Sequence, residues 1–142
     1  MKSFLRSSDD KVLALMRLIL GFIFLGHGTQ KALGWWQGPG WHGTMQMFTA
    51  GMHIPAFFAV CAILAEFLGG ILLLAGFLSR LAALAIAIIM MVAILRVHLL
   101  IGLLGGPHGA GYEYPLALLA LAILIIFKGG GAMSVDRAIA KE

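Results

Sequence analysis

The chain alternates between long apolar runs and short segments that are polar or rich in glycine. A helix needs about 20 mainly apolar residues to cross a bilayer, and "GFLSR" and "GGPHGAGYEYP" are breaks between such runs. The pattern therefore predicts an all-α integral membrane protein, a bundle of four transmembrane helices. The predicted spans are roughly Val12–Leu33, Ala56–Gly76, Arg80–Leu104 and Glu113–Phe127.

The segments outside the spans carry patterns of their own. The outer loop, residues 34–55, holds three tryptophans, as an aromatic belt at a membrane interface does. Met45, Phe48 and Met52 recur there at helical spacing, which predicts a short amphipathic helix on the bilayer surface. A lid over a bound ligand is the less favoured interpretation. The tail, residues 128–142, is expected to be cytoplasmic and to hold a short helix capped by Ser134.

Composition supports a membrane protein of one domain, residues 1–142. Hydrophobic residues make up 61% of the chain and charged residues 11%, whereas a soluble domain has about 25% charged residues. So much apolar surface cannot be hidden in a core of this size. The net charge of +4 is thinly spread, so no nucleic-acid partner is expected. The single cysteine excludes an internal disulfide.

The distribution of Lys and Arg predicts the orientation. Cytoplasmic flanks of membrane spans are enriched in these residues. One side of the predicted bundle has chiefly Lys31, so both termini are expected on the other, cytoplasmic side. That side holds Lys2, Arg6, Lys11, Arg80, Lys128, Arg137 and Lys141.

One face of the first span combines small and charged residues. Residues 17, 21, 24, 28 and 31 recur at intervals that keep them on one side of a helix. Glycines at two of these positions permit a neighbouring backbone to approach closely, and His27 lies at the edge of the face. The members of this face are Arg17, Gly21, Phe24, Gly28 and Lys31.

Glu66 lies near the middle of the second span, where an isolated carboxylate cannot stay ionised. It must be protonated or find a cation or strong donors. A buried pair that only fixes helix register and a functional site are equally good interpretations. The partners available on other helices are Arg17, His27, Lys31, Arg96 and His98.

Arg96 and His98 are two residues apart, about 200° around a helix, so they cannot face the same partner. His98 is assigned to the interior. Arg96 either snorkels toward the outer headgroups or turns inward through a bend. A helix rises about 1.5 Å per residue. Counted in this way, the outer half of the bundle holds Arg96, His98, His27, Lys31 and Glu113. They predict a polar cluster that opens outward.

The chain resembles the DoxX family of small four-helix bacterial membrane proteins along nearly its whole length. The resemblance is carried by "FLGHGTQKALG", "AEFLGGILLLAGFLSRLAAL", "VAILRVH" and "GYEYPLALLALAILIIFKGGGAMSVD". It implies a multi-pass protein of the bacterial inner membrane. Because some members of the family are associated with quinone-linked oxidoreductases, it also implies a component of such a system.

The hypothesis that follows assigns roles to the polar cluster. A quinone needs an apolar slot, donors to its two carbonyl oxygens and protonatable groups nearby. The catalytic candidates are Glu66, His27, Lys31 and His98. The candidates for substrate binding are Arg17, Gln30, Trp35, Trp36, Arg96, Glu113 and Tyr114.

Other cofactors and functions are less favoured. His27 and His98 could be axial ligands of a haem, but Lys31 and Arg96 crowd that region. No metal site is expected, since three ligands on three helices lack motif spacing. The chain carries no flavin or dinucleotide fingerprint, so electrons would come from a redox protein partner. The alternatives are a binder or carrier of a small lipophile or ion, with dimerisation as one route to a complete pathway, and a non-catalytic assembly subunit.

Overall fold

The computed structural model describes residues 7–141 and is all-α in its regular structure. Lys2 and Arg6, which contribute to the predicted orientation, lie outside the described residues. Within residues 7–141, three helical segments are long and apolar enough to cross a membrane: α2, α4 and the continuous segment Ser79–His98. The elements are α2 (Lys11–Leu33), α3 (Gly40–Gln46), η1 (Met47–Gly51), α4 (Ala56–Ala75), α5 (Ser79–Ala93), η2 (Ile94–His98), α6 (Glu113–Lys128) and α7 (Val135–Lys141).

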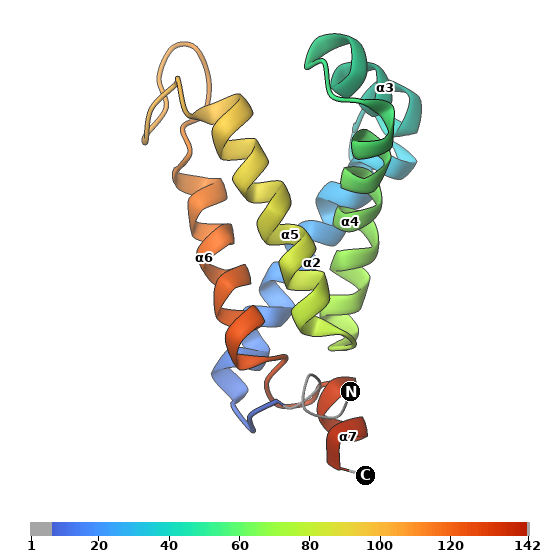
Figure 1. Cartoon of the computed structure of the whole chain (residues 1–142), viewed down its shortest axis with the longest axis vertical. Coiled ribbons are helices and arrows are strands. Elements are labelled where there is room, and N and C mark those ends of the chain that lie inside the picture. Colours follow the sequence, from blue (N-terminus) through green and yellow to red (C-terminus); the bar gives the residue numbers. More distant parts are fainter. Residues whose placement is uncertain (1–6, 142) are drawn as a thin grey trace.

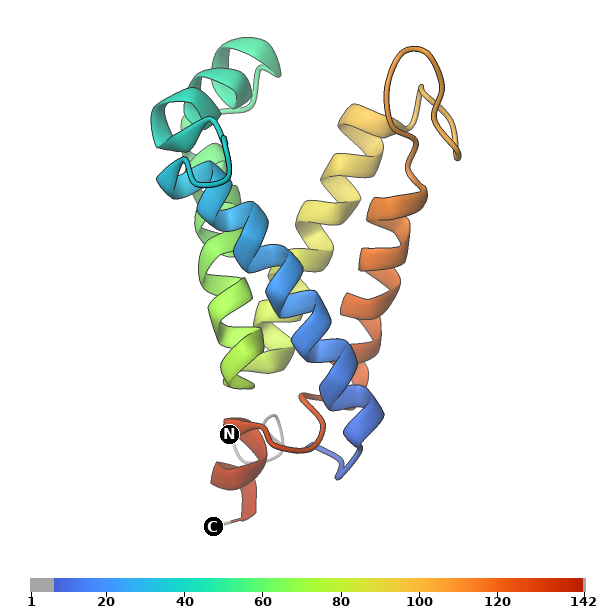
Figure 2. The same ribbon diagram turned by 180° about the vertical axis from the view of Figure 1, so that it is seen from behind.

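The long helices form two pairs. α2 packs mainly on α4, and α5 packs mainly on α6. The ribbons of the two pairs lie close together at the end of the bundle next to α7, and they diverge toward the opposite end, which carries α3 (Figures 1 and 2). These two ends are called the α7 end and the α3 end. η1 and η2 are π-helical turns, and both lie toward the α3 end.

The predicted face of α2 is confirmed as a packing surface. Arg17, Gly21, Phe24 and Gly28 are all buried. At the crossing with α4, a Cβ atom added to Gly28 would lie 2.4 Å from the Cα of Phe67, and one added to Gly70 would lie 2.4 Å from the nitrogen of Leu25. The two backbones therefore touch, and glycine is required on both helices.

At the α7 end, the segment after α6 is bound to the start of α5 by hydrogen bonds. Asp136 is buried, and its carboxylate accepts hydrogen bonds from the backbone nitrogens of Leu78 and Ser79, at 2.7 and 2.8 Å. It thereby satisfies orphan donors at the start of α5. Ser134 accepts a bond from the nitrogen of Arg137 at 3.3 Å, which confirms it as the N-cap of α7. The tail helix thus docks on the turn between α4 and α5.

The boundaries of three predicted elements need comment. The third helical segment ends at His98, six residues short of the predicted Leu104, because Gly102 and Gly105 have φ values of 102° and 77° that a right-handed helix cannot accommodate. α6 has 16 residues and falls below the length of the other three segments. The short helix of the outer loop is present as α3 and η1. Its location on a bilayer surface stays a prediction.

The crossing of α2 and α4 predicts that one substitution has different effects on stability at two glycines of α2. Gly28→Ala forces the backbones apart and should lower the free energy of unfolding by about 1–3 kcal/mol. Gly26→Ala is the matched control, because a Cβ atom there meets nothing within 4 Å. Denaturant unfolding in detergent measures both. Equal stability of the two variants would contradict the close crossing.

Candidate functional site

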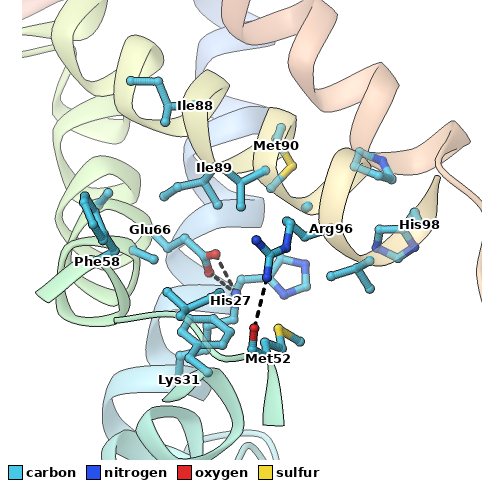
Figure 3. A pocket seen from close by; sticks show the side chains of 18 of the residues that line it. His27, Lys31, Met52, Phe58, Glu66, Ile88, Ile89, Met90, Arg96 and His98 are labelled. Atoms are coloured by element: carbon cyan, nitrogen blue, oxygen red, sulfur yellow. Dashed lines mark hydrogen bonds and ion pairs between the residues drawn. The ribbon is translucent and has the colours of Figure 1, made fainter. Parts of the chain in front are cut away.

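A cavity of about 740 Å³ lies between the two helix pairs toward the α3 end. Most of its wall is apolar and comes from α4, α5, α6 and residues 47–55. Its charged residues and histidines come from α2, α4, η2 and the segment after η1: His27, Lys31, His53, Glu66, Arg96 and His98. Figure 3 shows several of these side chains directed into the same space from different helices.

An ion pair between α2 and α4 lies in the cavity wall. The Nζ atom of Lys31 lies 2.5 Å from Oε1 and 2.6 Å from Oε2 of Glu66. The Glu66 side chain is 3% exposed and that of Lys31 is 23% exposed. The ammonium also lies 5.9 Å from the centre of the Phe48 ring, within range of a cation–π interaction. Of the five candidate partners for Glu66, the structure therefore selects Lys31.

Arg96 and His98 line the cavity but have different partners. The Nη2 atom of Arg96 donates a hydrogen bond to the carbonyl oxygen of Met52 at 3.1 Å. The Nδ1 atom of His98 lies 2.8 Å from the carbonyl oxygen of Ala110. A carbonyl only accepts, so this contact requires the proton on Nδ1. The prediction that the two residues cannot share a partner is confirmed, and Arg96 turns toward the cavity.

The remaining predicted residues divide into two groups. His27 and Tyr114 line the cavity, and the His27 ring centre lies 6.5 Å from that of Phe24. Five others lie outside the lining. Trp35 and Trp36 are exposed in the turn after α2, and Glu113 is exposed at the start of α6. Gln30 lies against the backbone of Gly38, and Arg17 is near the α7 end.

Arg17 joins three segments that are distant in sequence. Its side chain is buried and donates to the carbonyl oxygens of Gly130 at 2.7 Å, Leu74 at 3.0 Å and Met133 at 3.3 Å. A further bond goes to the carbonyl oxygen of Leu73. The guanidinium therefore ties the end of α4 and the segment before α7 to α2. In the described structure it contacts the backbone rather than the cavity.

Residues of the outer loop contribute to the cavity in a way that the sequence did not specify. Phe48 and Met52 were expected to face the bilayer, but both line the cavity, together with Met47 and His53. Their helical spacing was the available signal. It shows only that the segment has an apolar face, and the same face suits a bilayer or a cavity.

The arrangement can hold an amphiphile. An apolar wall accommodates hydrocarbon, while Lys31, Arg96 and His27 offer donors to oxygen atoms. Lys31, Glu66 and the histidines are also groups that can exchange protons. Among residues 7–141, no three His, Cys, Asp or Glu side chains are grouped so that they could hold a metal ion.

Comparison with known proteins assigns the chain to a family. The family model for DoxX matches residues 12–99, the stretch from α2 to η2 that supplies the ion pair and Arg96. The chain belongs to the DoxX family of membrane proteins. It is 28% identical over 138 residues to "Inner membrane protein YqjF" of Escherichia coli (strain K12), covering 97% of this chain and 99% of that protein.

A second relative bears a name that refers to activity. The DoxX chain is 29% identical over 122 residues to "Putative oxidoreductase CatD" of Bacillus subtilis (strain 168). The alignment covers 86% of this chain and 82% of the relative. No solved structure matches the chain.

The ion pair predicts strong coupling between its members. Lys31→Met or Glu66→Leu alone leaves an uncompensated charge and should lower the free energy of unfolding by about 3 kcal/mol. The double variant should recover most of this loss, because no unpaired charge then remains. Denaturant unfolding of all four proteins measures the cycle, and additive losses would show that the two side chains do not interact.

Arg17 should affect stability but not ligand binding. Arg17→Lys cannot reach all of the carbonyl oxygens that the guanidinium contacts, and about 1–3 kcal/mol of stability should be lost. Arg137→Lys, at a partly exposed position of α7, is the matched control and should be close to neutral. A change in cavity occupancy with unchanged thermal stability would contradict a purely structural role for Arg17.

Proposed function

We propose that this DoxX protein is a membrane-embedded component of a quinone-linked oxidoreductase system, and that the cavity holds the quinone. The observation that carries the proposal is the Lys31–Glu66 pair, which lies in the wall of an otherwise largely apolar cavity. An ion pair is costly in such surroundings, whereas a ligand with polar oxygens on an apolar body makes use of it. The relative named as an oxidoreductase supports the same class of function.

The residues present fit a quinone. The volume of about 740 Å³ lies within the range of small-molecule sites, roughly 300–1,000 Å³. An ammonium has three N–H donors, and Glu66 accepts two, so one remains for a carbonyl oxygen of the ring. Arg96 and His27 offer further donors across the cavity. The apolar residues of α4 and α5 suit the tail.

The chain's contribution in this proposal is binding and proton handling. A bound quinone takes up two electrons and two protons when it is reduced to the quinol. Lys31, Glu66 and His27 border the cavity and can hold or pass those protons. The electrons come from a separate redox protein that docks on the membrane protein. The arrangement of donors therefore orients the ring, and the apolar wall excludes water from it.

The proposal includes a topology. We place both termini in the cytoplasm of a bacterium and four spans in its inner membrane, with α6 as the fourth. Sixteen residues give about 24 Å of helix, short of the roughly 30 Å hydrocarbon core, so the bilayer must thin or the flanks of α6 must contribute. The α7 end holds the start of α5 with Arg80, the end of α6 with Lys128, and α7 with Arg137, in accord with the positive-inside rule.

Ligand extraction tests the function. Purified protein should carry a near-stoichiometric quinone, detected by mass spectrometry of an organic extract. Glu66→Gln and Lys31→Met should lose it because each removes half of the ion pair. Lys128→Met is the control, since Lys128 is exposed at the end of α6 and lies outside the cavity lining.

Two other outcomes would replace the proposal. A different lipophile that depends on Glu66 would make the protein a binder or carrier. Extracts free of lipophile from the wild type, in membranes that contain quinone, would favour an assembly subunit.

A further inference from the structure

The two sides of the cavity differ in how they meet the surroundings of the bundle. On the side of α2 and α6, Phe24 and Leu118 line the cavity and are 1% and 4% exposed, and the exposed lining residue Tyr114 (51%) lies in the first turn of α6, toward the α3 end. On the side of α4 and α5, Phe58 and Ile88 line it and are 61% and 57% exposed. A side chain that borders a cavity and is also exposed lies at an opening. The cavity therefore opens between α4 and α5.

The opening follows from the way in which α4 and α5 pack. Toward the α7 end the helices touch, and a Cβ atom added to Gly69 would lie 3.4 Å from Ile86. Toward the α3 end their ribbons diverge (Figure 1). Along this stretch the cavity side of α4 carries the small residues Cys61, Ala62 and Ala65. Short side chains on one helix and divergence of the pair leave the gap open.

The chemistry of the gap suits hydrocarbon. Its border on α4 and α5 is free of charged side chains between Phe58 and Ala65 and between Ala85 and Val92. Both stretches belong to helical segments that are long and apolar enough to span a membrane. At the α3 end, in contrast, Arg96 crosses to the Met52 carbonyl oxygen. An apolar tail that passed there would remove water from the guanidinium of Arg96, and burial of a charge without solvent is costly in free energy.

We propose that the gap between α4 and α5, bordered by Phe58, Cys61, Ala62, Ala65, Ile88 and Val92, is a lateral portal to the bilayer. The ligand enters head first from the lipid, its polar ring reaches Lys31 and Glu66, and its tail stays in the gap. The ligand is thus an amphiphile whose tail reaches the gap. The identity of the ring rests on the proposed function; the direction of entry rests on the exposed lining.

A portal-blocking variant tests this route. Ala62→Trp should fill the gap, and Leu64→Trp is the matched control because Leu64 is on the same helix, exposed and outside the cavity lining. Protein in nanodiscs is incubated with two probes, dimethoxy-methyl-benzoquinone without a tail and the same ring with a decyl tail. Bound quinone is then extracted and quantified by mass spectrometry.

The portal predicts a selective loss. Ala62→Trp should retain about tenfold less of the decyl-tailed probe. It should keep the tailless probe at the wild-type level, because a polar ring without an apolar tail can enter past Arg96 at the α3 end. Leu64→Trp should match the wild type for both. Equal retention of the decyl-tailed probe by Ala62→Trp and the wild type, or equal loss of both probes, would overturn the portal. Ile88→Trp, at an exposed position on the other border, replaces Ala62→Trp if that variant does not fold.

Cys61 permits a second test that needs no ligand. It is the single cysteine of the chain and lies on the border of the portal, so a nitroxide spin label can be attached there without other changes. In proteoliposomes its relaxation should respond more strongly to oxygen, which concentrates in lipid, than to a water-soluble nickel chelate. The reverse order would place the opening in water and overturn the portal.

In the experiment with the two quinone probes, absence of both probes from the wild type would contradict only the proposed function.

Discussion

The arrangement of the molecule depends on the pairing of a carboxylate and an ammonium within an apolar bundle. Glu66 is almost fully buried, and Lys31 meets both of its carboxylate oxygens from the neighbouring helix. Such a pair persists only if the helices approach closely enough for the side chains to meet. The glycines at the crossing of α2 and α4 provide that approach, because their missing Cβ atoms allow backbone contact. The position of the ion pair therefore depends on the close packing of the two backbones.

The two ends of the bundle have different roles. At the α7 end, Arg17 and Asp136 bind backbone groups from distant segments and hold the helix pairs together. At the α3 end, the pairs separate, and the space between them is the cavity. Arg96 contacts the Met52 carbonyl oxygen across this space. A bundle fastened at one end and open at the other can offer a site to a membrane-dissolved ligand without a change in its core.

Much of the fold and part of the site could be predicted from the sequence. The spacing of residues along a helix placed Gly21, Phe24, Gly28 and Lys31 on one face. A partner for Glu66 was expected because an unpaired charge is costly to bury. The choice among five partners depended on how closely α2 and α4 approach, which no single helix reveals. Arg17 was assigned to the site because it shares a helix face with Lys31, although its position in the chain already placed it nearer the cytoplasmic end of the first span. The role of Phe48 was missed because an apolar helix face suits lipid and cavity equally.

The most direct measurement is the nitrogen-15 chemical shift of the Lys31 ammonium in lipid nanodiscs, with and without the decyl-tailed benzoquinone. The account predicts that the Lys31 resonance moves when quinone is added, because the ring oxygen joins its hydrogen bonds. The resonance of Lys128, which lies outside the cavity lining, should stay in place. A Lys31 resonance that is unchanged at saturating quinone, or that moves no more than that of Lys128, would contradict the account.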